Sequence, residues 1–174
     1  MNKIFWPDKP TFNPDLCINL EVGQGDSVKI RKQALKEGYR EQDKRHVTLL
    51  SDSKIEEILK YTSLSKDEVS KKILQIANNY DWRYKELDIY HIEKVGSEDR
   101  PEVKEHRQSY VRAINMPDMG KFYKELDETF GTKLLVQFPH ITLFTKGEKE
   151  NLIYYGISIS SEEVFKKLKP IKII

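Results

Sequence analysis

Apolar residues recur along this chain with two different periods, and each period predicts its own set of elements. Helical spacing predicts helices over Val28–Lys36, from Ser51 through Leu59, and over Lys66–Asn79, Asp118–Phe130 and Ser161–Leu168. Alternating or β-branched runs predict strands over Leu16–Val22, His46–Leu50, Glu86–Val95, Ser109–Met116, Leu134–Thr145, Leu152–Ser160 and Ile171–Ile174. The strand ending at Val95 and the strand beginning at Ser109 form a hairpin in this prediction.

Several of these helices have recognisable ends in the sequence. Ser65, followed three residues later by Glu68, predicts a capping box at the start of a helix. Gly38 and Gly131 are placed to end two helices, and Pro117 is placed to begin one. Local chemistry therefore supports the helices independently of their apolar spacing.

The order of the predicted elements favours an α+β fold with mostly antiparallel sheets and helices on the outside. A chain of 174 residues suits a single domain over 1–174, built as one unit or as two small lobes sharing a core. Residues 1–15, rich in Pro, Asn and Asp, predict an irregular N-terminal arm, and residues 96–102 predict a polar hairpin loop.

Composition narrows the classes of protein to consider. The net charge is only +2, which argues against an extended, sequence-independent binder of nucleic acid but not against a small anionic ligand. The single cysteine, Cys17, allows no internal disulfide. No segment resembles a signal peptide or a membrane span. We expect a cytoplasmic protein without a membrane partner, and favour a monomer.

A short pattern occurs twice, 94 positions apart: RHVTLL at 45–50 and PHITLF at 139–144. Each copy is a His-x-Thr-Leu sequence in an apolar, β-branched run. Because side chains alternate across a strand, His46 and Thr48 face one side, and His140 and Thr142 do the same in the second copy. The chain has four histidines and seven threonines, so two such pairs are not expected from composition alone.

Two imidazoles facing one site suit phosphodiester chemistry. With an ordinary pKa of about 6.5, one histidine can accept a proton from the attacking group while the other donates one to the leaving alkoxide. The threonine hydroxyls can donate hydrogen bonds to the non-bridging phosphate oxygens. A zinc site is the weaker alternative, because each strand offers one ligand and Asp43 lies in a charged run. We therefore expect no metal and no cofactor.

The paired His-x-Thr strands resemble those of the 2H phosphoesterase superfamily, which includes bacterial 2′-5′ RNA ligase-like proteins and cyclic phosphodiesterases. The resemblance is strongest in INMPDMGKFYKELDETFG, FPHITLFTKG and YYGISIS, and weaker before the first motif and over 52–95. It implies a bilobal, pseudo-twofold α+β fold and metal-independent chemistry at 2′-linked or 2′,3′-cyclic phosphates. It also implies catalytic roles for His46, Thr48, His140 and Thr142.

Members of that superfamily use aromatic and basic side chains around the site to bind the substrate. The corresponding candidates in this chain are Tyr39, Arg40, Arg45, Phe144, Lys146, Tyr154 and Tyr155, each of which can also be explained as core or solvated surface. Residues 29–45 hold seven Lys or Arg against three acids, which predicts a surface able to receive one or a few phosphates. His91 and His106 stand outside any motif and are expected to be structural or exposed.

The expected substrate is thus a nucleotide, a short oligonucleotide or an RNA terminus. Three alternatives stay open at this point. The chain can join RNA ends through a 2′-5′ linkage, degrade a signalling cyclic or 2′-5′ oligonucleotide, or bind a nucleotide or RNA end without turnover. Because both motifs are intact, we favour hydrolysis of a phosphodiester over binding without catalysis.

Overall fold

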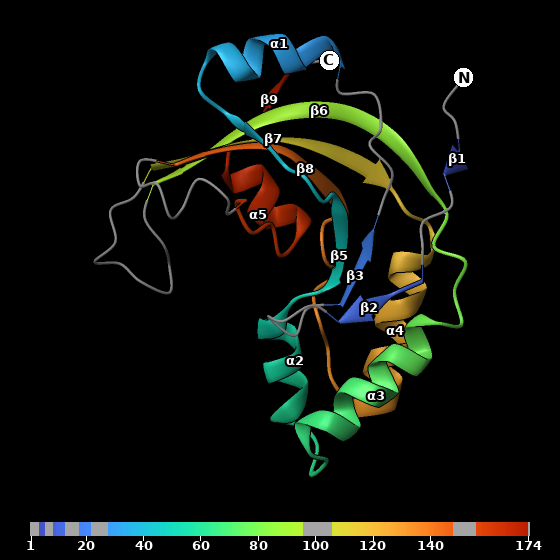
Figure 1. Ribbon diagram of the computed structural model, residues 1–174. Coiled ribbons are helices and arrows are strands. Elements are labelled where there is room, and N and C mark those ends of the chain that lie inside the picture. The colour runs from blue at the N-terminus through green and yellow to red at the C-terminus, as the bar shows by residue number, and fades with distance from the viewer. Residues whose placement is uncertain are drawn as a thin grey trace.

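The computed structural model describes residues 4–5, 9–12, 18–21, 28–95, 106–147 and 156–173. Over these residues the chain has an α+β fold with antiparallel strand pairs, as the sequence predicts. Figure 1 shows a curved sheet across the upper part of the molecule, with helix α1 on its convex side and helix α5 under its concave side. A second, smaller sheet and three further helices lie below it.

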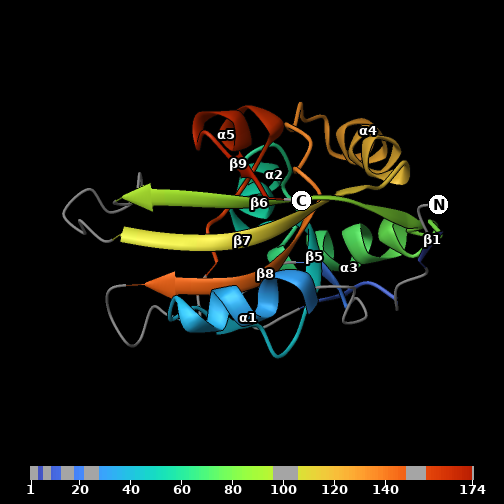
Figure 2. The same ribbon diagram turned by 90° about the horizontal axis from the view of Figure 1, so that it is seen from above.

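The curved sheet is built around the predicted hairpin. Strands β6 (Tyr84–Val95) and β7 (His106–Asn115) pair with each other, and β8 (His140–Gly147) pairs with β7. Within the described residues, three short strands complete this sheet: β1 (Ile4–Phe5), β4 (Arg40–Glu41) and β9 (Ile171–Lys172). Seen from above in Figure 2, β6, β7 and β8 run side by side, with α1 near the β8 edge.

The smaller sheet contains the first His-x-Thr motif. Its order is β2 (Thr11–Phe12), β3 (Ile18–Glu21) and β5 (His46–Leu50). Of the irregular arm predicted over residues 1–15, the described residues 9–10 are irregular, whereas residues 4–5 and 11–12 form short strands. Short strands form there because each pairs through its backbone with a longer strand, an effect of tertiary contact that local composition does not report.

The helices agree closely with their sequence signals. They are α1 (Val28–Lys36), α2 (Asp52–Leu59), α3 (Lys66–Ala77), α4 (Asp118–Phe130) and α5 (Glu162–Lys167). The capping box of Ser65 and Glu68 is present at the start of α3. Gly131 ends α4 with a φ of 69°, a left-handed conformation that glycine adopts without strain. Leu35, one of the apolar residues whose spacing predicts α1, is 48% exposed and so lies off its buried face.

Two predicted strands are corrected. The strand expected over Leu134–Thr145 begins only at His140, and at its predicted start the backbone of Leu134 and Leu135 is bonded to side chains instead of to a strand. The Leu134 amide donates to Asp127 Oδ1 at 2.9 Å, and the Leu135 carbonyl accepts from the Lys54 ammonium of α2. Residues 156–160 of the second predicted strand, Leu152–Ser160, form neither strand nor helix, and residues 152–155 lie outside the described part.

Two clusters of buried apolar side chains hold the elements together. The larger one joins α1 and the convex face of the curved sheet to the lower helices and the smaller sheet. The smaller one lies under the concave face, between the sheet, residues 157–159 and α5. Its members are Ile92, Val111, Ile157, Ile159 and Phe165. A residue of β7 that belongs to the larger cluster faces the convex side of the sheet, and one that belongs to the smaller cluster faces the concave side. The face that a side chain occupies decides whether it can share the candidate site.

Candidate active site

The first motif strand, β5, pairs with β3 in a register that is broken at one position. His46 lies opposite Glu21, and Thr48 lies opposite Asn19. The next residue of β3, Ile18, lies opposite Leu50, so Leu49 is an extra residue. This is a β-bulge, and it turns Leu50 to the face opposite Thr48.

The second motif strand, β8, repeats this arrangement against β7. His140 lies opposite Ala113, and Thr142 lies opposite Val111. Tyr110 lies opposite Phe144, so Leu143 is the extra residue, at the same place in the motif as Leu49. In each His-x-Thr-Leu sequence, the histidine and threonine therefore lie in register with the partner strand, and the register shifts at the leucine.

The bulges explain why both motifs end in two consecutive apolar residues. In regular alternation, the second of these would share the face of the threonine. With one extra residue in each strand, both members of each pair are removed from solvent: Leu49 and Leu50 are 0% exposed, Leu143 2% and Phe144 0%. Bulges occur often beside active sites, where they redirect side chains.

His140 occupies an apolar position on the concave face. Its ring stacks on Phe138 with centroids 6.1 Å apart, and Phe138 stacks in turn on Phe165 of α5 at 4.2 Å. His140 Nδ1 lies 2.9 Å from the Phe138 carbonyl oxygen, which can only accept, so Nδ1 carries a proton. In the neutral ring, Nε2 is consequently the unprotonated nitrogen.

The surroundings of His140 favour that neutral form. Burial lowers the pKa of His140 to about 4, against the opposite effect of the hydrogen bond to the Phe138 carbonyl. The positive charge of His46 lowers this pKa further. This effect agrees with a site that the two imidazoles share. Contact between β5 and β8 brings them together.

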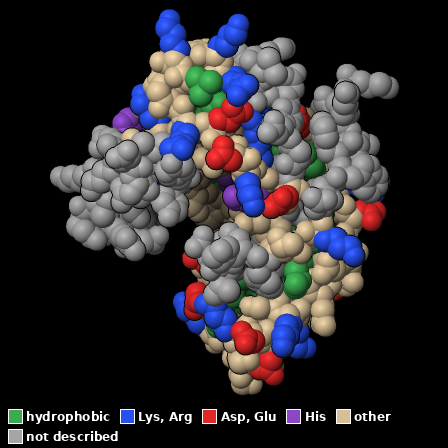
Figure 3. All heavy atoms as spheres, in the orientation of Figure 1, with side chains coloured by type: hydrophobic (Ala, Val, Ile, Leu, Met, Phe, Trp, Pro, Cys, Tyr) green, Lys and Arg blue, Asp and Glu red, His purple; other side chains and the backbone are tan. Residues whose placement is uncertain are grey.

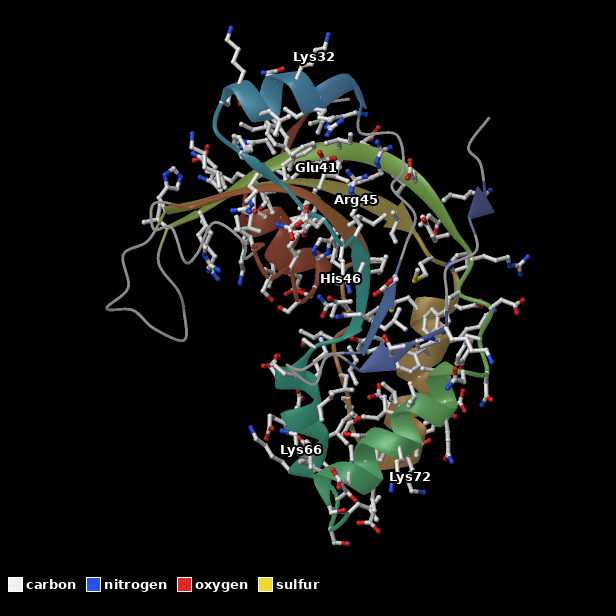
Figure 4. The ribbon with its side chains drawn as sticks, viewed as in Figure 1. Lys32, Glu41, Arg45, His46, Lys66 and Lys72 are labelled. Atoms are coloured by element: carbon white, nitrogen blue, oxygen red, sulfur yellow. The ribbon has the colours of Figure 1, made fainter. Side chains whose placement is uncertain are left out.

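His46 has a different neighbourhood. Figure 4 shows it on β5, where that strand passes the curved sheet. Loss of hydration lowers the pKa of His46 below its usual value, and the negative charge of Glu21 opposes this decrease. The residue opposite His140 is the apolar Ala113, whereas the residue opposite His46 is a carboxylate. Two motifs of nearly identical sequence therefore place unlike histidines in the site.

The threonines are half-buried and also have unlike neighbours. Asn19, opposite Thr48, is 7% exposed, and its Oδ1 is a buried atom with no hydrogen-bond partner. Thr142 is approached by the backbone of Gly156, where an added Cβ would lie 3.1 Å from Thr142 Oγ1. The four residues His46, Thr48, His140 and Thr142 thus occupy corresponding positions of two adjoining strands.

Most of the expected substrate-binding residues lie elsewhere. Phe144 is fully buried on the convex face, where its ring packs edge-on against Tyr110. The bulge at Leu143 is the reason, because regular alternation would have placed Phe144 beside Thr142. The structure therefore does not bring Phe144 to the histidines.

Tyr39 and Lys146 lie on the same convex side, near the C-terminal end of α1. The Tyr39 hydroxyl is 2.7 Å from His91 Nε2 and donates to Gln108 at 2.7 Å. The Lys146 ammonium donates to the Glu37 carbonyl and lies 5.4 Å from the centre of the Tyr39 ring. These contacts give Tyr39, Lys146 and His91 a structural role between helix and sheet.

Arg45 is also directed away from the histidines. It is 5% exposed and donates to Glu41 at 2.9 Å, and Glu41 accepts from Arg31 of α1 at 2.8 Å. Figure 4 shows Glu41 and Arg45 beside each other beneath α1. The predicted basic surface over residues 29–45 is in part this ion-paired cluster. Its exposed members on α1 include Lys32, which Figure 4 shows pointing away from His46. Lys and Arg side chains gather at this end of the molecule in Figure 3.

Arg40 is the candidate that shares a face with the second motif. It lies opposite Thr145, which the bulge turns to the concave face, and its side chain is exposed. Gln42, two residues on, donates to Thr145 Oγ1 at 2.9 Å. The two remaining candidates, Tyr154 and Tyr155, lie outside the described residues.

Sequence reasoning missed four residues of this site: Asn19, Glu21, Phe138 and Gly156. A signal existed for Phe138, which precedes His140 by two positions in the quoted FPHITLFT run. A weaker signal existed for the bulges, in the break of alternation after each threonine. Asn19 and Glu21 had no usable signal, because their place beside His46 and Thr48 depends on the pairing of β3 with β5.

Comparison with known proteins adds no assignment: the chain matches no family model, no curated protein and no solved structure. In the part of the chain that the structure describes, no helix has the length and apolar character needed to cross a bilayer. Among the same residues, no group of three or more His, Cys, Asp or Glu side chains is arranged to hold a metal ion.

Proposed function

We propose that this protein is a phosphodiesterase of the 2H type, in which His46 and His140 act as a general acid and base on one phosphate. The observation that carries the proposal is the contact between the two motif strands, β5 and β8, which hold His46 and His140 at corresponding positions. Equal register and equally placed bulges in β5 and β8 support a pseudo-twofold arrangement of two lobes around this site.

The two histidines differ in their surroundings, and this difference supports one assignment of the general base and the general acid. His140 has Nε2 unprotonated and a low pKa, so it is the general base that takes a proton from the attacking water. Burial lowers the pKa of His46, but only this histidine has a carboxylate, Glu21, opposite it to oppose that decrease, so we assign it the role of general acid. Thr48 and Thr142 donate hydrogen bonds to the non-bridging oxygens, where negative charge grows in the transition state.

In the proposed hydrolysis, the water oxygen forms a new bond to phosphorus and the bond to the leaving ester oxygen breaks. The proton of the water passes to His140 Nε2, and the leaving oxygen takes a proton from His46. The products are a phosphomonoester and an alcohol, with one water consumed. Afterwards His140 is charged and His46 neutral, and proton exchange with solvent restores the starting state. A bound phosphate anion raises the pKa of both imidazoles and so helps to keep His46 charged.

The substrate that we propose is a 2′,3′-cyclic or 2′-5′ phosphodiester of a nucleotide or RNA end. The net charge of only +2 favours a short substrate over a long strand. Arg40 of β4 lies on the same face of the sheet as Thr145 of β8, and it is the described cation best placed to meet a second phosphate.

The test is a panel of phosphodiesters, including 2′,3′-cyclic nucleotides and 2′-5′ and 3′-5′ dinucleotides, with products identified by mass spectrometry. We expect turnover of a 2′-linked or cyclic member that survives EDTA and is lost in His46→Ala and in His140→Ala. Tight binding without any product would support the non-catalytic module instead. Activity that EDTA removes and a divalent metal restores would contradict the proposed chemistry.

A further inference from the structure

Gly156 lies so close to the side chain of Thr142 that a side chain at residue 156 would crowd the threonine. A Cβ added at Gly156 would lie 3.1 Å from Thr142 Oγ1, 3.3 Å from Cγ2 and 3.7 Å from Cβ. The first two distances are shorter than ordinary van der Waals contacts between carbon and these atoms. The glycine backbone therefore covers both branches of the threonine.

Neither partner of this contact can withdraw easily. The residues that follow Gly156 are anchored in the concave-face cluster, with Ile157 2% and Ile159 0% exposed. The Ile159 carbonyl also accepts a hydrogen bond from the buried Gln137 amide at 2.6 Å. On the other side, Thr142 lies opposite Val111 in the β7–β8 pair.

Rotation of the threonine does not remove the conflict. Its two branches occupy two of the three staggered positions on Cβ, and both occupied positions face Gly156. Any other rotamer still leaves one branch in one of those two positions. A side chain at residue 156 must therefore displace the Thr142 hydroxyl or the backbone that holds it.

We propose that Gly156 is a positioning residue, which sets the location of the Thr142 hydroxyl for its hydrogen bond to the phosphate. This inference rests on the proposed function for its catalytic consequence, and on the contact distances for its structural part. A residue outside both His-x-Thr motifs thus controls one of the four catalytic groups. Thr48 lies opposite Asn19 instead, and the three atoms nearest to an added Cβ at Gly156 all belong to Thr142.

The experiment is a double-mutant cycle between Gly156→Ala and Thr142→Ala, with kcat and the free energy of unfolding measured for each variant. A shift of the hydroxyl by half an ångström is expected to lower kcat about tenfold in the wild-type background. In the Thr142→Ala background, the nearest atom to the new methyl is Cβ at 3.7 Å, an ordinary contact. There Gly156→Ala should change kcat by less than about twofold and should not change stability.

Two matched controls separate this role from a general effect of the substitution. In the Thr48→Ala background, the tenfold effect of Gly156→Ala should persist, because the three atoms nearest to the added methyl all belong to Thr142. Gly120→Ala in α4, where an added Cβ has nothing within 4 Å, should leave kcat unchanged. A loss of kcat from Gly156→Ala that is equally large in the Thr142→Ala background would overturn the proposal.

A structural measurement keeps this inference distinct from the proposed function. Three-bond couplings in the NMR spectrum report the side-chain torsion of Thr142 whether or not any substrate is turned over. If no phosphodiester is hydrolysed but the torsion changes in Gly156→Ala, the proposed function fails and the positioning contact stands. If the torsion and the Thr142 backbone shifts are the same in both proteins, Gly156 does not position Thr142.

Discussion

The low pKa of His140 predicts a specific loss of stability in acid. In the unfolded chain a histidine titrates near pH 6.5, whereas burial lowers the pKa of His140 in the folded protein to about 4. Between these values the unfolded chain binds more protons than the folded one. Stability from the neutral imidazole is therefore complete above pH 6.5 and is lost as the pH falls toward 4.

The magnitude follows from the difference between the two pKa values. Each pKa unit corresponds to about 1.4 kcal/mol, so the full effect is about 3 kcal/mol, of which about 2 kcal/mol is lost between pH 7 and pH 5. This is a large part of the 5–15 kcal/mol that typically separates folded from unfolded domains.

Urea denaturation from pH 7 to pH 4.5, compared between wild type and His140→Gln, isolates this contribution from that of the carboxylates. The wild type should lose stability more steeply, and the difference between the two proteins should shrink by about 2 kcal/mol from pH 7 to pH 5. NMR titration of the ring should show that His46→Asn raises the pKa of His140, because a neighbouring positive charge is removed. Parallel pH profiles, or a His140 pKa near 6.5, would refute the burial that we assign to this ring.

Four further predictions concern the site and its surroundings. Glu21→Gln should lower the pKa of His46 and move the alkaline limb of kcat/KM to lower pH, and an unmoved limb would remove Glu21 from the site. His46→Ala should lower kcat at least about 10²-fold with little change in melting temperature. A lower melting temperature without that loss of kcat would mean that His46 is merely structural. Phe144→Ala should destabilise the fold by about 3–5 kcal/mol in denaturation experiments, while the folded fraction keeps its kcat. Phe138→Leu, which removes the stack on His140, should instead lower kcat. If Phe144→Ala lowers kcat and Phe138→Leu does not, Phe144 is the substrate-binding ring.

Local sequence signals predicted those features whose cause lies within a few residues. The capping box at Ser65, the helix stop at Gly131 and the strand at His46–Leu50 are of this kind, and the structure confirms them. Alternation along a strand also predicted that His140 and Thr142 share a face. Alternation could not predict where this pattern breaks, because a β-bulge depends on how two strands pair and not on the sequence of one strand.

By itself, then, the sequence determined an α+β chain with two His-x-Thr strands and the chemistry that those side chains can perform. Tertiary structure alone decided that the two histidines differ. The partner strand places Glu21 beside His46 and Ala113 beside His140, and α5 places Phe165 behind Phe138. A pKa depends on charges and burial contributed by residues distant in the chain. For the same reason, only the packed structure shows that Phe144 leaves the site and that Gly156 enters it.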